Sequence, residues 1–125
     1  MHLVIGTEQI ISPSKERIEE AINDMGEVSK RWVALSPSGD EISPRIIATG
    51  GDNAQVMVSF YGLDDDIPSI CVNHDSRIGN VQVWDGSSYN SYPSRYVISK
   101  GMAIRAFKYF FDFQDKEPNL IWEER

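Results

Sequence analysis

The chain has 125 residues and a formal net charge of −7, from 19 acidic and 12 basic side chains. This length predicts one domain over residues 1–125, and a hydrophobic content of 41% is enough for a core without metals or disulfides. The negative charge disfavours direct nucleic-acid binding, because phosphates would be repelled. Two interpretations of the charge stay open: it keeps the protein soluble, or it attracts a basic partner.

Neither a signal peptide nor a membrane span is found in the sequence. The N-terminus lacks a basic start followed by a long apolar run. No stretch approaches the roughly eighteen apolar residues of a spanning helix. Cys71 has no second cysteine to pair with, which favours a reducing compartment, although a lone buried cysteine also behaves as a small hydrophobe. We therefore expect a soluble, cytoplasmic protein that does not bind membranes.

A first helix is predicted after two short apolar runs, residues 3–5 and 10–11, one of which is expected to form an edge strand. Ser12 is the candidate N-cap, and Pro13 would take the first helical position. An apolar stripe at helical spacing follows, formed by Ile18, Ala21, Ile22 and Met25. Gly26 is expected to end this helix in a left-handed conformation.

From residue 29 the apolar period changes to two, which is typical of strands. The predicted strands cover residues 32–35, 42–48, 54–61, 69–73, 81–84 and 95–98. Pro44 removes a ladder donor and indicates an edge or a bulge. The first strands are expected to form consecutive hairpins, which make an antiparallel meander. Residues 85–93 are expected to be a polar loop with two exposed tyrosines, Tyr89 and Tyr92.

The last thirty residues contain the longest helical pattern. Ser99 is a good N-cap, and an apolar stripe follows it, formed by Ala103, Ala106, Phe107, Phe110 and Phe111. Pro118 ends the helix, and Trp122 is expected to return an extended tail to the core. The sequence therefore predicts an α+β fold: an antiparallel sheet of five or six strands, with an N-terminal and a C-terminal helix packed on one face.

No set of residues has the spacing of a known catalytic or metal site. The two histidines, His2 and His74, have no zinc-ligand spacing with the single cysteine. Cys71 and His74 would point to opposite faces of an extended strand, so they are a poor nucleophile pair. Gly50-Gly51 is not followed by the helix of a phosphate-binding loop. We expect no catalytic residues, no metal site, no cofactor and no enzymatic activity.

Tyrosines and aspartates gather in or beside the loops between the predicted strands. The candidate partner-binding residues are Tyr61, Asp64, Asp65, Asp66, Asp75, Asp85, Tyr89 and Tyr92. Residues 64–66 lack the alternate spacing and terminal glutamate of an EF-hand, which favours a solvated acidic loop over a calcium site. Aromatic anchors among acidic groups are typical of an electrostatically steered protein interface. The alternative is that the tyrosines only pack beside the sheet.

The C-terminal segment, residues 92–124, combines three patterns that identify a possible family. These are Tyr92-Pro93 followed by Tyr96-Val97, a helix ending in Phe110-Phe111, and the tail Pro118-x-Leu120-x-Trp122-Glu123. Together they resemble immunity proteins of bacterial polymorphic toxin systems, specifically the first-numbered immunity family, found beside deaminase and nuclease-type toxins. The earlier part of the chain matches in layout only, through its first helix and the Gly50-Gly51 turn.

The resemblance implies an α+β fold, no catalysis, and a cognate toxin domain neutralised in the cytoplasm by direct binding over its active site. The toxin would be a nucleic-acid-targeting deaminase or nuclease. The matching residues Tyr96, Phe110, Phe111 and Trp122 have structural roles in our interpretation, so the contact surface is expected in the loops. Two alternatives stay open: an acidic cytoplasmic interaction adaptor without a toxin, and a small-ligand or metal-binding enzyme. The oligomeric state is not predicted.

Overall fold

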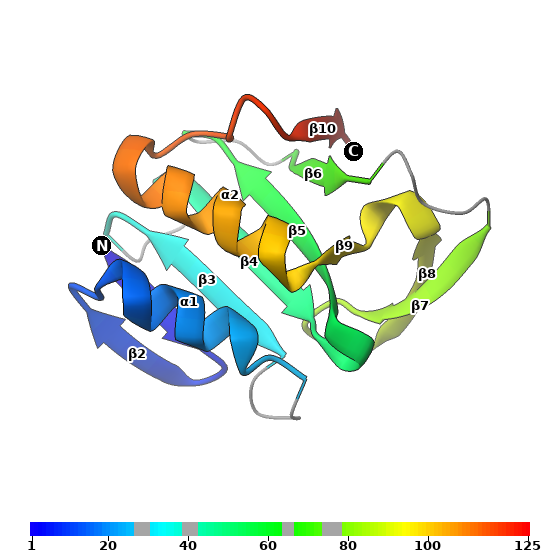
Figure 1. Cartoon of the computed structure of the whole chain (residues 1–125), viewed down its shortest axis with the longest axis horizontal. Coiled ribbons are helices and arrows are strands. Elements are labelled where there is room, and N and C mark those ends of the chain that lie inside the picture. Colours follow the sequence, from blue (N-terminus) through cyan, green and yellow to red (C-terminus); the bar gives the residue numbers. More distant parts are fainter. Residues whose placement is uncertain (27–30, 39–42, 64–66, 74–78) are drawn as a thin grey trace.

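The computed structural model describes residues 1–26, 31–38, 43–63, 67–73 and 79–125 (Figure 1). The helices are α1 (Lys15–Asn23) and α2 (Lys100–Phe113). The strands of the main sheet are β1 (His2–Ile5), β2 (Glu8–Ile11), β3 (Trp32–Ser36), β4 (Arg45–Gly50), β5 (Gln55–Tyr61), β6 (Ser69–Val72), β9 (Ile98–Ser99) and β10 (Ile121–Glu124). A separate hairpin is formed by β7 (Asn80–Trp84) and β8 (Tyr89–Pro93).

Within the described residues the main sheet has eight strands, in the order β10-β6-β5-β4-β3-β1-β2, and β9 pairs with β5. All of these pairings are antiparallel. The predicted α+β class and antiparallel sheet are confirmed, but the predicted strand number, five or six, is wrong. The prediction expected one strand from the two N-terminal apolar runs, whereas both form strands, and it missed β10; β2 and β10 each have four residues and too little alternation to be recognised locally.

The N-terminal apolar runs form a hairpin, and the first of them is not an edge strand. β1 lies between β2 and β3, with Leu3 opposite both Ile10 and Leu35. β2 is therefore the edge strand, and its Ile11 is 71% exposed. A run forms an edge strand if it pairs with only one neighbouring strand. Which of the two runs does so is decided by pairing with β3, which is distant in the chain.

The N-cap predicted at Ser12 is wrong, because the cap of α1 lies two residues later in the chain. Ser14 caps the helix, and its Oγ accepts the backbone N–H of Arg17 at 3.1 Å. Ser12 instead has a φ of +55° and donates its N–H to the Met1 carbonyl, which extends the β1–β2 pairing. The helix ends at Asn23, and Gly26 follows with a φ of +127°.

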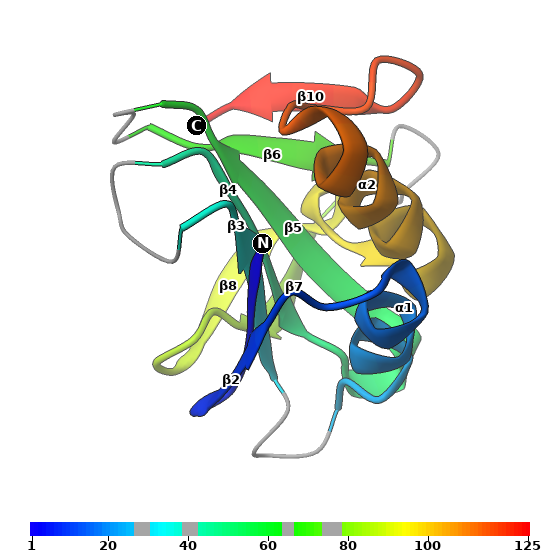
Figure 2. The same cartoon turned by 90° about the vertical axis from the view of Figure 1, so that its left-hand side faces the viewer.

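The core lies between the helices and one face of the sheet, and Figure 2 shows α1 and α2 on the same side of it. The sheet contributes alternate residues of its central strands: Leu3, Ile5, Val33, Leu35, Ile46, Ala48, Val56 and Val58. The predicted stripe of α2 enters this core, with Phe107 and Phe110 fully buried. The predicted cap is confirmed as well, since Ser99 Oγ accepts the Met102 N–H at 3.1 Å. No helix of the described ranges is long and apolar enough to cross a membrane.

The C-terminal tail forms β10, the strand at the edge of the sheet next to β6. Trp122 lies opposite Cys71 in this pairing, and its ring makes an edge contact with Phe60 at a centroid distance of 6.4 Å. Its indole N–H donates to the Glu117 carbonyl at 3.0 Å. The predicted return of Trp122 to the core is therefore confirmed, and so is the predicted burial of Cys71.

The loop predicted over residues 85–93 is wrong, because most of it is strand β8. Tyr92 is only 7% exposed, whereas Tyr89 is 47% exposed. Asn90 and Ser91 are polar and both exposed, so the composition of this segment resembles that of a loop although it pairs with β7 as a strand. The strand predicted over residues 95–98 is mostly a 3₁₀ turn, Ser94–Tyr96, and only its last residue enters β9.

Candidate functional site

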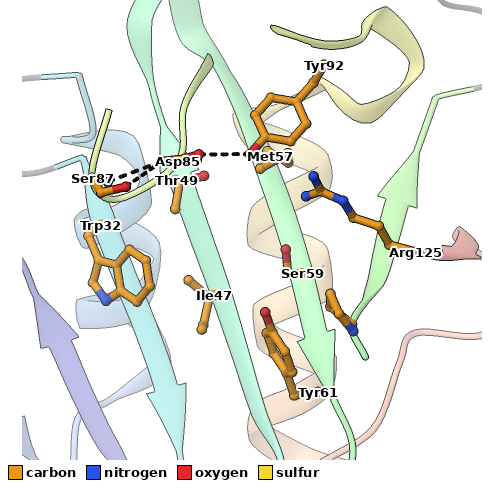
Figure 3. Close-up of a pocket in the computed structure, with 11 residues that line it drawn as sticks. Trp32, Ile47, Thr49, Met57, Ser59, Tyr61, Asp85, Ser87, Tyr92 and Arg125 are labelled. Carbon is orange, nitrogen blue, oxygen red and sulfur yellow. Dashed lines mark hydrogen bonds between the residues drawn. The ribbon is translucent and has the colours of Figure 1, made fainter. Parts of the chain in front are cut away.

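The sheet face opposite the helices carries a groove of about 220 Å³, and the β7–β8 hairpin forms one of its walls (Figure 3). Its floor consists of the side chains that alternate with the core residues of β3, β4 and β5. These are Trp32, Ile47, Thr49, Met57, Ser59 and Tyr61. The remaining lining residues come from the hairpin and from one end of the β6–β10 pair: Asp85, Ser87, Tyr92, Pro68 and Arg125.

Asp85 holds the turn of the hairpin in place. One carboxylate oxygen accepts the backbone N–H groups of Ser87 and Ser88 and the Ser87 hydroxyl. The other accepts the Tyr92 hydroxyl at 2.9 Å and the Asn90 side-chain amide. Burial by itself would raise the pKa of Asp85, but these hydrogen bonds outweigh it and lower the pKa from 3.8 to about 2. Both oxygens of the Asp85 carboxylate are thus hydrogen-bonded to groups of the hairpin.

The hairpin turn rests directly on Trp32 in the groove floor. Gly86 has a φ of +105°, and a Cβ at this position would lie 2.5 Å from the Trp32 ring. Only a glycine permits both this conformation and this approach. The width of the groove at this end is therefore set by a contact between backbone and ring.

A second cluster ties the hairpin to the end of the sheet. The Arg31 guanidinium lies 5.3 Å from the centre of the Trp84 ring and 5.4 Å from that of Tyr89. Arg31 also forms an ion pair with Asp52 at 3.9 Å. The Tyr89 hydroxyl donates to Asp52 at 2.7 Å. Tyr89 is therefore held in place by this cluster and is not part of the groove lining.

The structure brings three of the predicted contact residues together, since Tyr61, Asp85 and Tyr92 all line the groove. Tyr89 lies in the Arg31 cluster. Asp64, Asp65, Asp66 and Asp75 lie outside the described residues.

The other eight lining residues were not predicted, and three of them matter most for the site: Trp32, Thr49 and Arg125. Strand alternation could have indicated Trp32, which occupies the outer face of the strand predicted over residues 32–35, whereas Thr49 lies one residue beyond the predicted strand 42–48 and belongs to β4. No local signal marks Arg125, which reaches the groove only because β10 pairs with β6.

The groups that the groove offers for contact are aromatic rings, hydroxyls and a guanidinium. The Arg45 guanidinium stacks 4.1 Å from the centre of the Tyr61 ring, and the Arg125 guanidinium lies 4.8 Å from that of Tyr92. In the part of the chain that the structure describes, no group of three or more His, Cys, Asp or Glu residues could hold a metal ion. Cys71 is fully buried, and burial, with a smaller effect of Glu117, raises the pKa of its thiol to about 12.

The fold and the groove together define an α+β protein with its helices on one sheet face and a groove lined partly by aromatic side chains on the other. No protein-family model matches the chain, and a search of curated proteins finds no relative.

We expect Asp85→Asn to lower the free energy of unfolding by about 1 kcal/mol at neutral pH, a value reduced from the full linkage by solvent screening. The lowered pKa of Asp85 means that its stabilisation is present above pH 3.8 and is lost as the pH falls through about 2. The difference between wild type and variant should therefore shrink over this range. Urea unfolding at a series of pH values measures it, and a difference that stays constant with pH would contradict the assignment.

Proposed function

We propose that this protein is an immunity protein, which binds a cognate bacterial toxin in the cytoplasm and covers its active site. The toxin would be a deaminase or nuclease that acts on nucleic acid. The observation that carries the proposal is the aromatic groove on the sheet face that the helices leave open. An N-terminal and a C-terminal helix on one face leave the opposite face available to a partner. The likeness of residues 92–124 to the immunity family supports the same function.

Two kinds of side chain would act differently in such a complex. Tyr61 and Trp32 are half-buried and offer ring surface at the groove floor, so they are the candidate anchors. Tyr92 is buried, and burial together with donation to Asp85 raises its pKa, so it shapes the wall as a neutral hydroxyl. Asp64, Asp65, Asp66 and Asp75 would steer the encounter with a basic toxin surface, which a net charge of −7 also favours.

Co-expression with the toxin domain encoded by a neighbouring gene tests the proposal directly. We expect rescue of growth and co-purification of the two proteins. Tyr61→Ala should weaken the complex about thirtyfold, which corresponds to an anchor worth ~2 kcal/mol. Reversing the charges of residues 64–66 should slow association and reduce its salt dependence.

The matched control is Tyr109→Ala, which truncates a half-buried tyrosine of α2, on the helix side of the sheet. It should leave toxin binding unchanged at equal thermal stability. Failure of the wild-type protein to bind or neutralise the neighbouring toxin would refute the proposed function. If no toxin gene adjoins this one, the acidic interaction adaptor becomes the better explanation.

A further inference from the structure

We infer that the groove receives the carboxylate of an aspartate or glutamate side chain from a protein partner, with Arg125 as its counter-charge. The inference concerns the chemistry of the groove and applies to whichever protein covers this face. It therefore goes beyond the proposed function and is tested without a toxin.

Arg125 places a positively charged guanidinium at the groove. Its backbone N–H donates to the Pro68 carbonyl at 3.0 Å, and its guanidinium lies against the Tyr92 ring, so the side chain is directed into the groove (Figure 3). It forms no ion pair with any residue that the structure describes. Other arginines differ, since carboxylates lie within 2.8 to 3.9 Å of Arg17, Arg31, Arg95 and Arg105.

The acid that lines the same groove keeps its negative charge, but it is hydrogen-bonded within its own hairpin and not to Arg125. Asp85 accepts five hydrogen bonds from its own hairpin, which occupy both carboxylate oxygens. It forms no ion pair with Arg125. The guanidinium fork, whose shape matches a carboxylate, is therefore the charged group left for a partner.

The groove floor supplies a second, independent sign of a missing polar ligand. Thr49 is only 5% exposed, it lines the groove, and its hydroxyl has no hydrogen-bond partner among the residues that the structure describes. A buried hydroxyl without a partner is unfavourable, and most such groups in proteins are paired. Ser59 and Ser87 add hydroxyl groups to the lining. Hydroxyl donors around a guanidinium are a suitable environment for an anionic oxygen.

The size of the groove favours a side chain over a free small molecule. A volume of about 220 Å³ is below the range of roughly 300–1,000 Å³ that encloses typical small ligands. A partner's side chain needs a smaller enclosing volume than a free ligand, because the surface of the partner covers the part of the side chain that lies outside the groove. Trp32 and Tyr61 flank the floor and offer ring surface to the segment that carries it. The guanidinium of Arg125 at the groove would also select against partners that place a basic side chain here.

The test uses capped peptides as probes of the whole protein, followed by NMR of its backbone amides at low ionic strength. Ac-Gly-Glu-Gly-NH2 is expected to shift the amide signals of Ser59, Ser87 and Arg125 in a saturable way. Ac-Gly-Gln-Gly-NH2 and Ac-Gly-Lys-Gly-NH2 should not. Arg125→Gln should weaken the glutamate peptide about tenfold or more, as expected for a charge-assisted pair. Arg125→Lys should retain part of the affinity, because it keeps the charge and loses the fork.

Arg95→Gln is the matched control, since Arg95 also lies against a tyrosine ring but is already paired with Glu123 at 2.8 Å. It should leave peptide binding unchanged. Equal binding of the lysine or glutamine peptide, or equal binding by Arg125→Gln, would overturn the inference. A fourth probe, Ac-Gly-Gly-Gly with a free carboxyl end, separates the two sources of a carboxylate. If only this peptide binds, the occupant is a chain terminus and our assignment to a side chain is wrong.

Discussion

Replacing Gly51 with alanine is expected to lower the free energy of unfolding by about 3 kcal/mol or more. Gly51 has a φ of +104°, which strains any other residue. A Cβ here would lie 2.6 Å from the Gly26 nitrogen and 2.7 Å from the Met25 carbonyl carbon. These are backbone atoms just beyond the end of α1, so they cannot yield by a rotamer change. Relief requires the end of α1 to move away from the turn between β4 and β5.

The matched control for this prediction is Gly79→Ala. Gly79 has a φ of +120°, yet a Cβ there would meet no atom within 4 Å. It should cost only the backbone strain, about 1–2 kcal/mol. Urea unfolding followed by circular dichroism measures both variants. Equal losses at the two positions would show that the contact between Gly51 and the end of α1 contributes nothing.

Phe110→Ala is expected to lower the free energy of unfolding by about 3–5 kcal/mol, the usual range for a large aromatic removed from a core. The Phe110 ring is fully buried and makes an edge contact with Phe60 of β5, at a centroid distance of 6.1 Å. Phe60 in turn contacts Trp122 of β10. Truncation would thus leave a cavity where α2, the central sheet and the C-terminal strand meet.

Phe113→Ala provides the comparison on the same helix. Phe113 is 65% exposed and contacts Tyr109 at 4.6 Å between ring centroids. Its truncation should change the stability by less than about 1 kcal/mol. Thermal and urea unfolding of both variants measure the difference. A small effect of Phe110→Ala would mean that the core of α2 repacks, and the proposed organising role of this ring would then be wrong.

The central sheet was predictable where alternation runs over several residues. β5 shows this best, since Val56 and Val58 face the helices, and Ser59 and Tyr61 face the groove. The candidate site was predictable only in part. The sequence indicates Tyr61 and Tyr92 as loop-adjacent tyrosines, and they line the same groove because the β7–β8 hairpin folds over the sheet. No pattern within the hairpin predicts this arrangement, in which Gly86 approaches Trp32.

What the sequence by itself determined are the two helices with their apolar stripes, the cap at Ser99, and the meander of β3, β4, β5 and β6. These features follow from interactions within a few residues, which leave a periodic pattern in the chain. The tertiary structure alone decided the pairing of β1 between two strands, the conversion of the tail into β10, and the burial of Tyr92. Each of these depends on a partner distant in the chain. A four-residue strand has too few side chains to show a periodic pattern that would predict the pairing. Arg125 enters the groove for the same reason.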